Sequence, residues 1–443
     1  MKTFLFHLLE KLKASAWTIP AALSIAAILL SQLSLDLDHH YYSPSDGLLS
    51  WIEVSSAEGA RSVLSTIATS LLTVAGVSFS SIMVTMTLAS QQFGPRLLRN
   101  FIKDKFSQIV LGALIATYVY CLFILRGVRT ASESPFVPQF STLTALVLTM
   151  ICLGLFIRFV HHIITEIQVE RVAADAYGLL ENSIKAVFPE RGAAMAEQWP
   201  IEPGERGWDI TAGKTGYVQA INYETLAEIA QANNATFSVL PKAGDFISQG
   251  RSVVRVVDGP LEKEATDSFR SDIRGAFLSG QVRTSEQDFE YGIRQLVELA
   301  LRALSPGIND PFTAMNCIDY LGAGLQLAFS RPLPHPVRRD EEGNVRLFCR
   351  KSSYRDLVET SINQIRQAAV ERCDVSCRLL EMLAETAELS NSAEQQDALM
   401  EQGLLIKENT LPALTNDHDR ESLLDRFDHL TQTCHLIDPT QNA

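Results

Sequence analysis

The sequence lacks charge over a long stretch near its beginning. No Asp, Glu, Lys or Arg side chain lies between Arg61 and Arg96. A helix over residues 62–90 would be about 43 Å long at about 1.5 Å per residue, which exceeds the roughly 30 Å hydrocarbon core of a bilayer. The missing charge therefore excludes an ordinary surface helix and predicts a transmembrane helix.

The common signatures of catalysis are missing as well. The sequence contains no P-loop, GxGxxG, HExxH or GxSxG motif, so we expect neither an enzyme nor a bound cofactor. Its seven cysteines have no framework spacing, which is typical of a reduced compartment and not of a disulfide scaffold. No metal site is predicted.

Positive charge is scarce in the second part of the chain. Residues 1–170 carry eleven basic and ten acidic side chains, whereas residues 171–443 carry 27 basic and 41 acidic ones. The net charge of -13 thus arises after residue 170. An acidic domain repels phosphate backbones, so a nucleic acid is not expected among the partners.

Long apolar runs predict a transmembrane domain of four spans over residues 1–165. The spans are expected at about 16–35, 62–90, 109–125 and 143–160. Basic residues precede the first span and follow the second, which places both termini in the cytoplasm by the positive-inside rule. The first run has no small-residue cleavage site after it and is predicted to be a retained anchor. The lipid bilayer is the first expected partner.

The second span has an unusual composition, because twelve of its 29 residues are Ser or Thr. A helix that faces only lipid would be filled with Leu, Ile and Phe, so this one is expected to face protein or water. Close packing against other helices is one interpretation, a water-filled path in an oligomer another, and a lipid-binding or sensing surface a third. The polar residues at helical spacing are Thr66, Thr69, Thr73, Ser80, Thr87 and Gln91.

Basic residues also recur at helical spacing after the second span. One interpretation is a juxtamembrane helix that touches anionic lipid, and the alternative is a coupling helix that passes movement to the cytoplasmic domain. These residues are Arg96, Arg99, Lys103 and Lys105.

The cytoplasmic part begins with a connecting helix and linker over residues 166–212. Short apolar runs over residues 213–260, separated by turns at Gly244-Asp245 and Gly250, predict a small β-module. It resembles the half-barrel of biotinyl and lipoyl carrier domains, although no lysine stands in the carrier context. Residues 261–443 are expected to be mainly α-helical.

A distinctive segment, RTSEQDFEYGIRQLVELALRALSPGINDPFTA, begins at Arg283. It predicts a helix over residues 286–304, with Arg283, Asp288 and Arg302 as ion-pair partners that fix this helix against the β-module; a subunit interface is the alternative role.

The turn at the end of this segment contains Asn309, Asp310 and Pro311. Asp310 is expected to cap the next helix and Pro311 to be its first residue. A catalytic or metal cluster of Asn309, Asp310 and Thr313 is the alternative interpretation. Further along, we predict a hairpin around residues 340–344.

The remaining chain is predicted to form helices over residues 353–390, 393–408 and 418–434. The fold class is thus mostly α, with a four-helix transmembrane region, a small β-module and an α-helical domain.

Three segments resemble a known family. LASQQFGPRLLRNF after the second span, the Gly-Asp turn module and ALSPGINDPFTA are similar to the bacterial predicted membrane proteins grouped as domain of unknown function twenty-two fifty-four. The resemblance implies a multi-pass protein of the bacterial inner membrane with a soluble part after its membrane region. It implies no catalytic residues.

The resulting hypothesis is a homo-oligomeric passive channel or pore with a cytoplasmic regulatory domain. The alternative is a non-conducting sensor or scaffold whose acidic domain docks a cytoplasmic protein.

Overall fold

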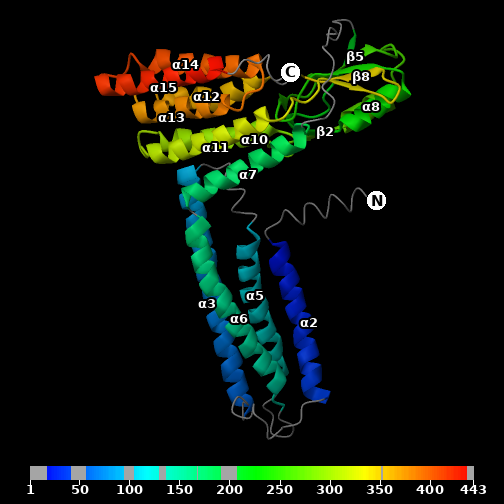
Figure 1. Ribbon diagram of the computed structural model, residues 1–443. Coiled ribbons are helices and arrows are strands. Elements are labelled where there is room, and N and C mark those ends of the chain that lie inside the picture. The colour runs from blue at the N-terminus through cyan, green and yellow to red at the C-terminus, as the bar shows by residue number, and fades with distance from the viewer. Residues whose placement is uncertain are drawn as a thin grey trace. The chain divides into compact units, whose positions relative to one another are not determined.

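The computed structural model describes residues 17–40, 56–93, 104–128, 136–166, 168–190, 207–350 and 353–436. The chain divides into two compact units, Met1–Gln168 and Val169–Ala443. Figure 1 labels the helices and strands of both.

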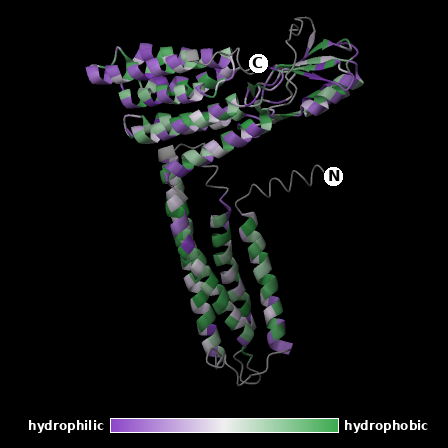
Figure 2. Cartoon of the chain, viewed as in Figure 1, coloured by the Kyte–Doolittle hydropathy of each residue, from purple (hydrophilic) through white to green (hydrophobic). Residues whose placement is uncertain are grey.

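Unit 1 contains four helices that are long and apolar enough to cross a membrane, among the residues described. Figure 2 shows that hydrophobic residues predominate along them. Each of the four predicted spans falls largely on one of these helices, and each helix is longer than its predicted span. The helices are α2 (Thr18–His40), α3 (Ala57–Phe93), α5 (Lys105–Gly127) and α6 (Gln139–Glu166).

Helix α5 is the centre of unit 1, because it packs against α2, α3 and α6 more extensively than these helices pack against one another. Its residues Leu114, Tyr120 and Ile124 are fully buried, together with Leu64 of α3 and Phe159 of α6. The Tyr120 hydroxyl donates a hydrogen bond to the carbonyl of Ser141, 3.1 Å away, which ties α5 to α6. The apolar contacts of one central helix therefore hold the bundle together.

Unit 2 is built from stacked helices with two small sheets at one end (Figure 1). Helices α10 and α11 pack on α7 and on each other, α12 and α13 pack on that pair, and α14 and α15 pack on α13. The helices are α7 (Val169–Val187), α10 (Phe289–Ala303), α11 (Pro311–Phe329), α12 (Tyr354–Ala368), α13 (Cys373–Ala387), α14 (Ala393–Thr410) and α15 (Asp417–Leu436).

The larger sheet has the strand order β1-β5-β3-β8-β7, and the smaller has the order β4-β2-β6. All pairings are antiparallel except that of β3 with β8. The strands are β1 (Trp208–Thr211), β2 (Gly216–Ile221), β3 (Thr236–Val239), β4 (Phe246–Ile247), β5 (Ser252–Asp258), β6 (Phe277–Gly280), β7 (Val337–Arg339) and β8 (Val345–Phe348).

The sheets extend beyond the predicted β-module on both sides. Strand β1 precedes residue 213, while β6, β7 and β8 follow residue 260. The hairpin predicted around residues 340–344 is confirmed by the pairing of β7 with β8. The hairpin joins the larger sheet through the pairing of Phe237 with Leu347. These residues are far apart in the sequence, so no local pattern predicts this pairing. The likeness to carrier domains stays a prediction from the sequence.

The helices differ from the sequence prediction in two places: one helix lies within the predicted β-module at residues 223–232, and the helix predicted over residues 353–390 is divided. Helices α8 (Tyr223–Ala232) and α9 (Asp267–Gly275) cover the core of the sheets through Leu226, Phe269 and Ile273. The single helix predicted over residues 353–390 is wrong, because α12 ends at Ala368 and α13 begins at Cys373. Neither Gly nor Pro marks this break; instead, the Ser376 hydroxyl donates to the carbonyl of Ala369 across it.

Candidate functional site

The six polar residues predicted to share one face of the second span do so on α3. We call Thr66, Thr69, Thr73, Ser80, Thr87 and Gln91 the hydroxyl face. All six are exposed in the chain. The buried residues of α3 lie on the opposite side at about 100° per residue, and they include Leu64, Ala68, Leu71 and Ala75.

The threonine hydroxyls of this face donate to carbonyls of their own helix. Thr66 donates to Ser62 at 2.8 Å, Thr69 to Ser65 at 2.9 Å and Thr73 to Thr69 at 2.9 Å. Thr87 donates likewise to Met83 at 2.8 Å. Each hydroxyl oxygen therefore keeps acceptor capacity on the outside of the helix. Among the helices that the structure describes, packing of α3 within the chain uses the other face. Packing between copies, a water path and lipid therefore stay as interpretations of the hydroxyl face.

The predicted basic group after the second span lies mostly outside the described residues. Arg96, Arg99 and Lys103 belong to that part of the sequence, while Lys105 is the exposed first residue of α5. Directly before it, Asp104 caps α5 by accepting from the backbone N–H groups of Phe106 and Ser107, both at 3.0 Å.

Two contacts at the helix ends of unit 1 escaped the sequence analysis. Asp104 also lies 3.0 Å from Nε2 of His162 on α6. Asp38 lies beyond the predicted end of the first span at residue 35. It is a buried residue of α2 that accepts from the backbone N–H groups of Phe140 and Ser141 at 2.8 and 2.9 Å. It thereby caps α6 across more than a hundred residues of sequence, a distance over which sequence spacing carries no signal.

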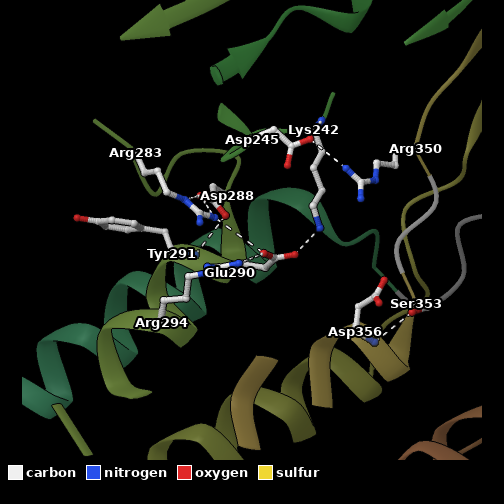
Figure 3. Close-up of polar contacts among 10 residues, drawn as sticks. All are labelled: Lys242, Asp245, Arg283, Asp288, Glu290, Tyr291, Arg294, Arg350, Ser353 and Asp356. Carbon is white, nitrogen blue, oxygen red and sulfur yellow. Dashed lines mark hydrogen bonds and ion pairs between the residues drawn. The ribbon is translucent and has the colours of Figure 1, made fainter. Parts of the chain in front are cut away.

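Unit 2 holds a charged cluster where the turn before β4 meets the start of α10 (Figure 3). Arg283 donates to Asp288 at 2.6 Å, Arg294 donates to Glu290 at 3.2 Å, and Lys242 also binds Glu290. Arg350 reaches Asp245 at 3.1 Å. We call this set the junction cluster; its members are Lys242, Asp245, Arg283, Asp288, Glu290, Arg294 and Arg350.

Burial sets the electrostatics of the junction cluster. The Asp288 side chain is only 2% exposed, and this burial raises its pKa despite the Arg283 guanidinium. Burial also acts to raise the pKa of Glu290, but hydrogen bonds from Lys242 and Arg294 outweigh it and lower that pKa. Two adjacent carboxylates of one helix turn are thus shifted in opposite directions.

Gly244 brings the β-module onto this cluster. Its φ of +91° lies in the left-handed region, and its N–H donates to the carbonyl of Val218 at 2.8 Å. Asp288 in turn caps α10 by accepting from the N–H of Tyr291 at 3.2 Å. The Gly-Asp turn and the start of the distinctive segment are separate in the sequence. In the fold they therefore lie in contact.

The remaining predicted residues lie elsewhere on unit 2. Arg302 is in the last turn of α10, so it does not join Arg283 and Asp288 at the first turn. Asp310 caps α11 by accepting from the N–H of Thr313 at 3.1 Å, and Pro311 begins that helix, as predicted. Asn309 has a φ of +52° and accepts from Arg372.

Four membrane-length apolar helices followed by a mixed α and β unit define an integral membrane protein. The chain belongs to the family of predicted membrane proteins DUF2254, whose model matches residues 13–385. This confirms the resemblance noted in the sequence.

The chain is also similar to curated proteins of mycobacteria. An uncharacterized protein of Mycobacterium bovis and one of Mycobacterium tuberculosis are each 28% identical over 378 residues, which cover 82% of this chain and 71% of the relative. No solved structure matches the chain.

Proposed function

We propose that this protein is a homo-oligomeric passive channel of the bacterial inner membrane. Copies of α3 surround a water-filled path with their hydroxyl faces, and both termini and unit 2 lie in the cytoplasm, where unit 2 regulates the path. The proposal assigns no enzymatic reaction to the chain.

The observation that supports this proposal is the exposure of the whole hydroxyl face. Thr66 at one end and Gln91 at the other are both on the surface of the chain, about seven helical turns apart. Hydroxyl oxygens in such a row replace part of the hydration shell of a small permeant species without binding it tightly.

The absence of charge in α3 from Ser62 onward favours passive movement. Ion-coupled carriers place ionisable residues in mid-membrane, where they bind protons or cations. No such residue lies between Arg61 and Arg96. A path lined by this face would offer dipoles and no fixed charge.

Conductance across planar bilayers tests the proposal. The purified full-length protein is expected to conduct, and Thr73→Leu or Ser80→Leu is expected to change the unitary conductance. Ser81→Leu is the matched control, because Ser81 is also exposed but lies about 100° away from Ser80 around the helix. Silence of the wild-type protein under every ionic condition, or a strictly monomeric mass in detergent, would overturn the proposal.

The charge of the second half favours one alternative, a non-conducting sensor or scaffold. The excess of 41 acidic over 27 basic side chains in residues 171–443 suits a basic cytoplasmic protein as partner. Salt-sensitive co-purification of one such protein with the intact chain from native membranes, together with absent conductance, would favour this alternative.

A further inference from the structure

We propose that unit 2 binds a small phosphate-type dianion in a cavity beside the junction cluster. The cavity has a volume of about 180 Å³. Its wall includes Lys242, Arg338, Arg350, Glu290, Tyr223 and Cys349. This space holds several water molecules but is below the roughly 300–1,000 Å³ typical of pockets for drug-sized ligands, so it suits a small ligand.

Charge around the cavity favours an anion. Each carboxylate at the wall already has a guanidinium partner from beside the cavity, Asp288 from Arg283 and Glu290 from Arg294. When these partners and Asp245 are included, five cationic side chains (Lys242, Arg283, Arg294, Arg338 and Arg350) face three carboxylates. The surroundings of the cavity thus carry two more positive than negative charges, although residues 171–443 as a whole carry more negative than positive charges.

Arg338 is the cationic residue of the cavity wall that we expect to bind the ligand directly. Its guanidinium carbon lies 4.5 Å from the centre of the Tyr223 ring. The guanidinium carries five N–H donors in a planar fork, and this fork matches two oxygens of a phosphate in bidentate fashion. Its other neighbour on the wall is Cys349, whose pKa burial raises to about 11, so the neutral thiol leaves the charge of Arg338 intact at pH 7.

Tyr223 and Lys242 supply further donors. Burial raises the pKa of Tyr223 to about 12, so its hydroxyl remains protonated at neutral pH. The Lys242 side chain extends from the turn toward Glu290 (Figure 3), and its ammonium retains donors beyond that ion pair. An arginine fork, an ammonium and a phenol form a donor set that matches the oxygens of a phosphate group.

The ligand's source is free phosphate, a soluble phosphomonoester or a lipid with a phosphomonoester headgroup. Isothermal titration of the full-length protein in a zwitterionic detergent separates them with three probes: inorganic phosphate, glycerol 3-phosphate and dioctanoyl phosphatidic acid. The tightest of the three identifies the source. Binding of at least one with a millimolar or lower Kd supports the proposal. Binding of none overturns it, as does equal binding of citrate, because a polycarboxylate of similar charge then suffices.

The deciding variant is Arg338→Gln, which is expected to weaken binding at least tenfold. Arg339→Gln is its control, because Arg339 is the next residue of β7 and is also exposed, but does not line the cavity. The Arg339→Gln variant is expected to bind with wild-type affinity.

Arg338→Lys is expected to bind with intermediate affinity, because the charge remains while the planar guanidinium fork is lost. Unchanged circular dichroism and melting without ligand separate lost binding from misfolding. Wild-type affinity in Arg338→Gln would overturn the site.

Discussion

A β-carbon added to Gly244 would lie 2.3 Å from Oδ2 of Asp288 and 2.4 Å from a terminal guanidinium nitrogen of Arg283. The turn of the β-module therefore lies in direct contact with the ion pair at the start of α10. Only a glycine allows this approach, because real β-carbons do not come so close to other heavy atoms.

Gly244→Ala is expected to destabilise unit 2 strongly. The left-handed backbone alone costs about 1–2 kcal/mol, and displacing the ion pair adds about 1–3 kcal/mol. Gly250→Ala is the control, because its φ of +88° is similar but nothing lies within 4 Å of the added carbon. Thermal unfolding of the full chain in detergent should show the larger loss for Gly244→Ala. Equal losses would mean that the turn adapts without disturbing Asp288.

Arg283→Met is expected to lower the free energy of unfolding more than Asp288→Asn does. Arg283→Met leaves the buried Asp288 carboxylate without its guanidinium, and such a change typically costs about 3 kcal/mol or more. Asp288→Asn still accepts a hydrogen bond from the Tyr291 N–H and so preserves the helix cap. Chemical unfolding of both variants at pH 7 measures the difference. The reverse order would show that capping, and not charge pairing, dominates at this residue.

Glu290 is expected to make the stability of unit 2 depend on pH at values below 4.5, the ordinary pKa of glutamate. Its pKa in the fold is lowered from 4.5, so its contribution is present above that value and is lost as the pH falls through its folded pKa. Glu290→Gln should therefore lower the melting temperature at pH 7, and the difference from wild type should shrink below pH 4.5. The raised pKa of Asp288 contributes to stability with the opposite sign in both proteins. The Glu290 carboxylate is one cause of that shift, so Glu290→Gln also reduces this opposing contribution. A difference that stays constant from pH 7 to pH 3.5 would contradict this prediction.

Asp38 is expected to stabilise the membrane unit by capping α6. Asp38→Ala removes the acceptor for two N–H groups and should cost about 1–2 kcal/mol, whereas Asp38→Asn should cost less. Asp36→Ala is the control, because Asp36 is exposed on the same helix. Melting of the purified protein in detergent measures the three variants. Equal melting of Asp38→Ala and Asp36→Ala would show that the cap contributes nothing.

Cysteines on α3 are expected to report contacts between copies, if the proposed assembly holds. Thr73→Cys, on the hydroxyl face, should form disulfide-linked dimers in membranes under mild oxidation. Ala68→Cys, buried against the other helices of its own chain, should not. Native Cys121 and Cys152 are buried and are therefore not expected to link copies. Crosslinks through both positions, or neither, would contradict an interface at the hydroxyl face.

The sequence by itself determined the features that depend on local pattern. Uncharged apolar runs give four membrane-length helices because the bilayer core demands length and the absence of charge. The spacing of Thr66, Thr69 and Thr73 gives their shared face, and Asp310-Pro311 gives a helix start, because these depend on the geometry of one element.

Only the tertiary structure decided what lies next to these features. The exposure of the hydroxyl face depends on which side of α3 packs on its neighbours. The meeting of Gly244 with Asp288, the cap of α6 by Asp38 and the pairing of Phe237 with Leu347 join segments that are distant in sequence. Contacts of this kind arise from packing of the whole chain, so no spacing within a segment encodes them.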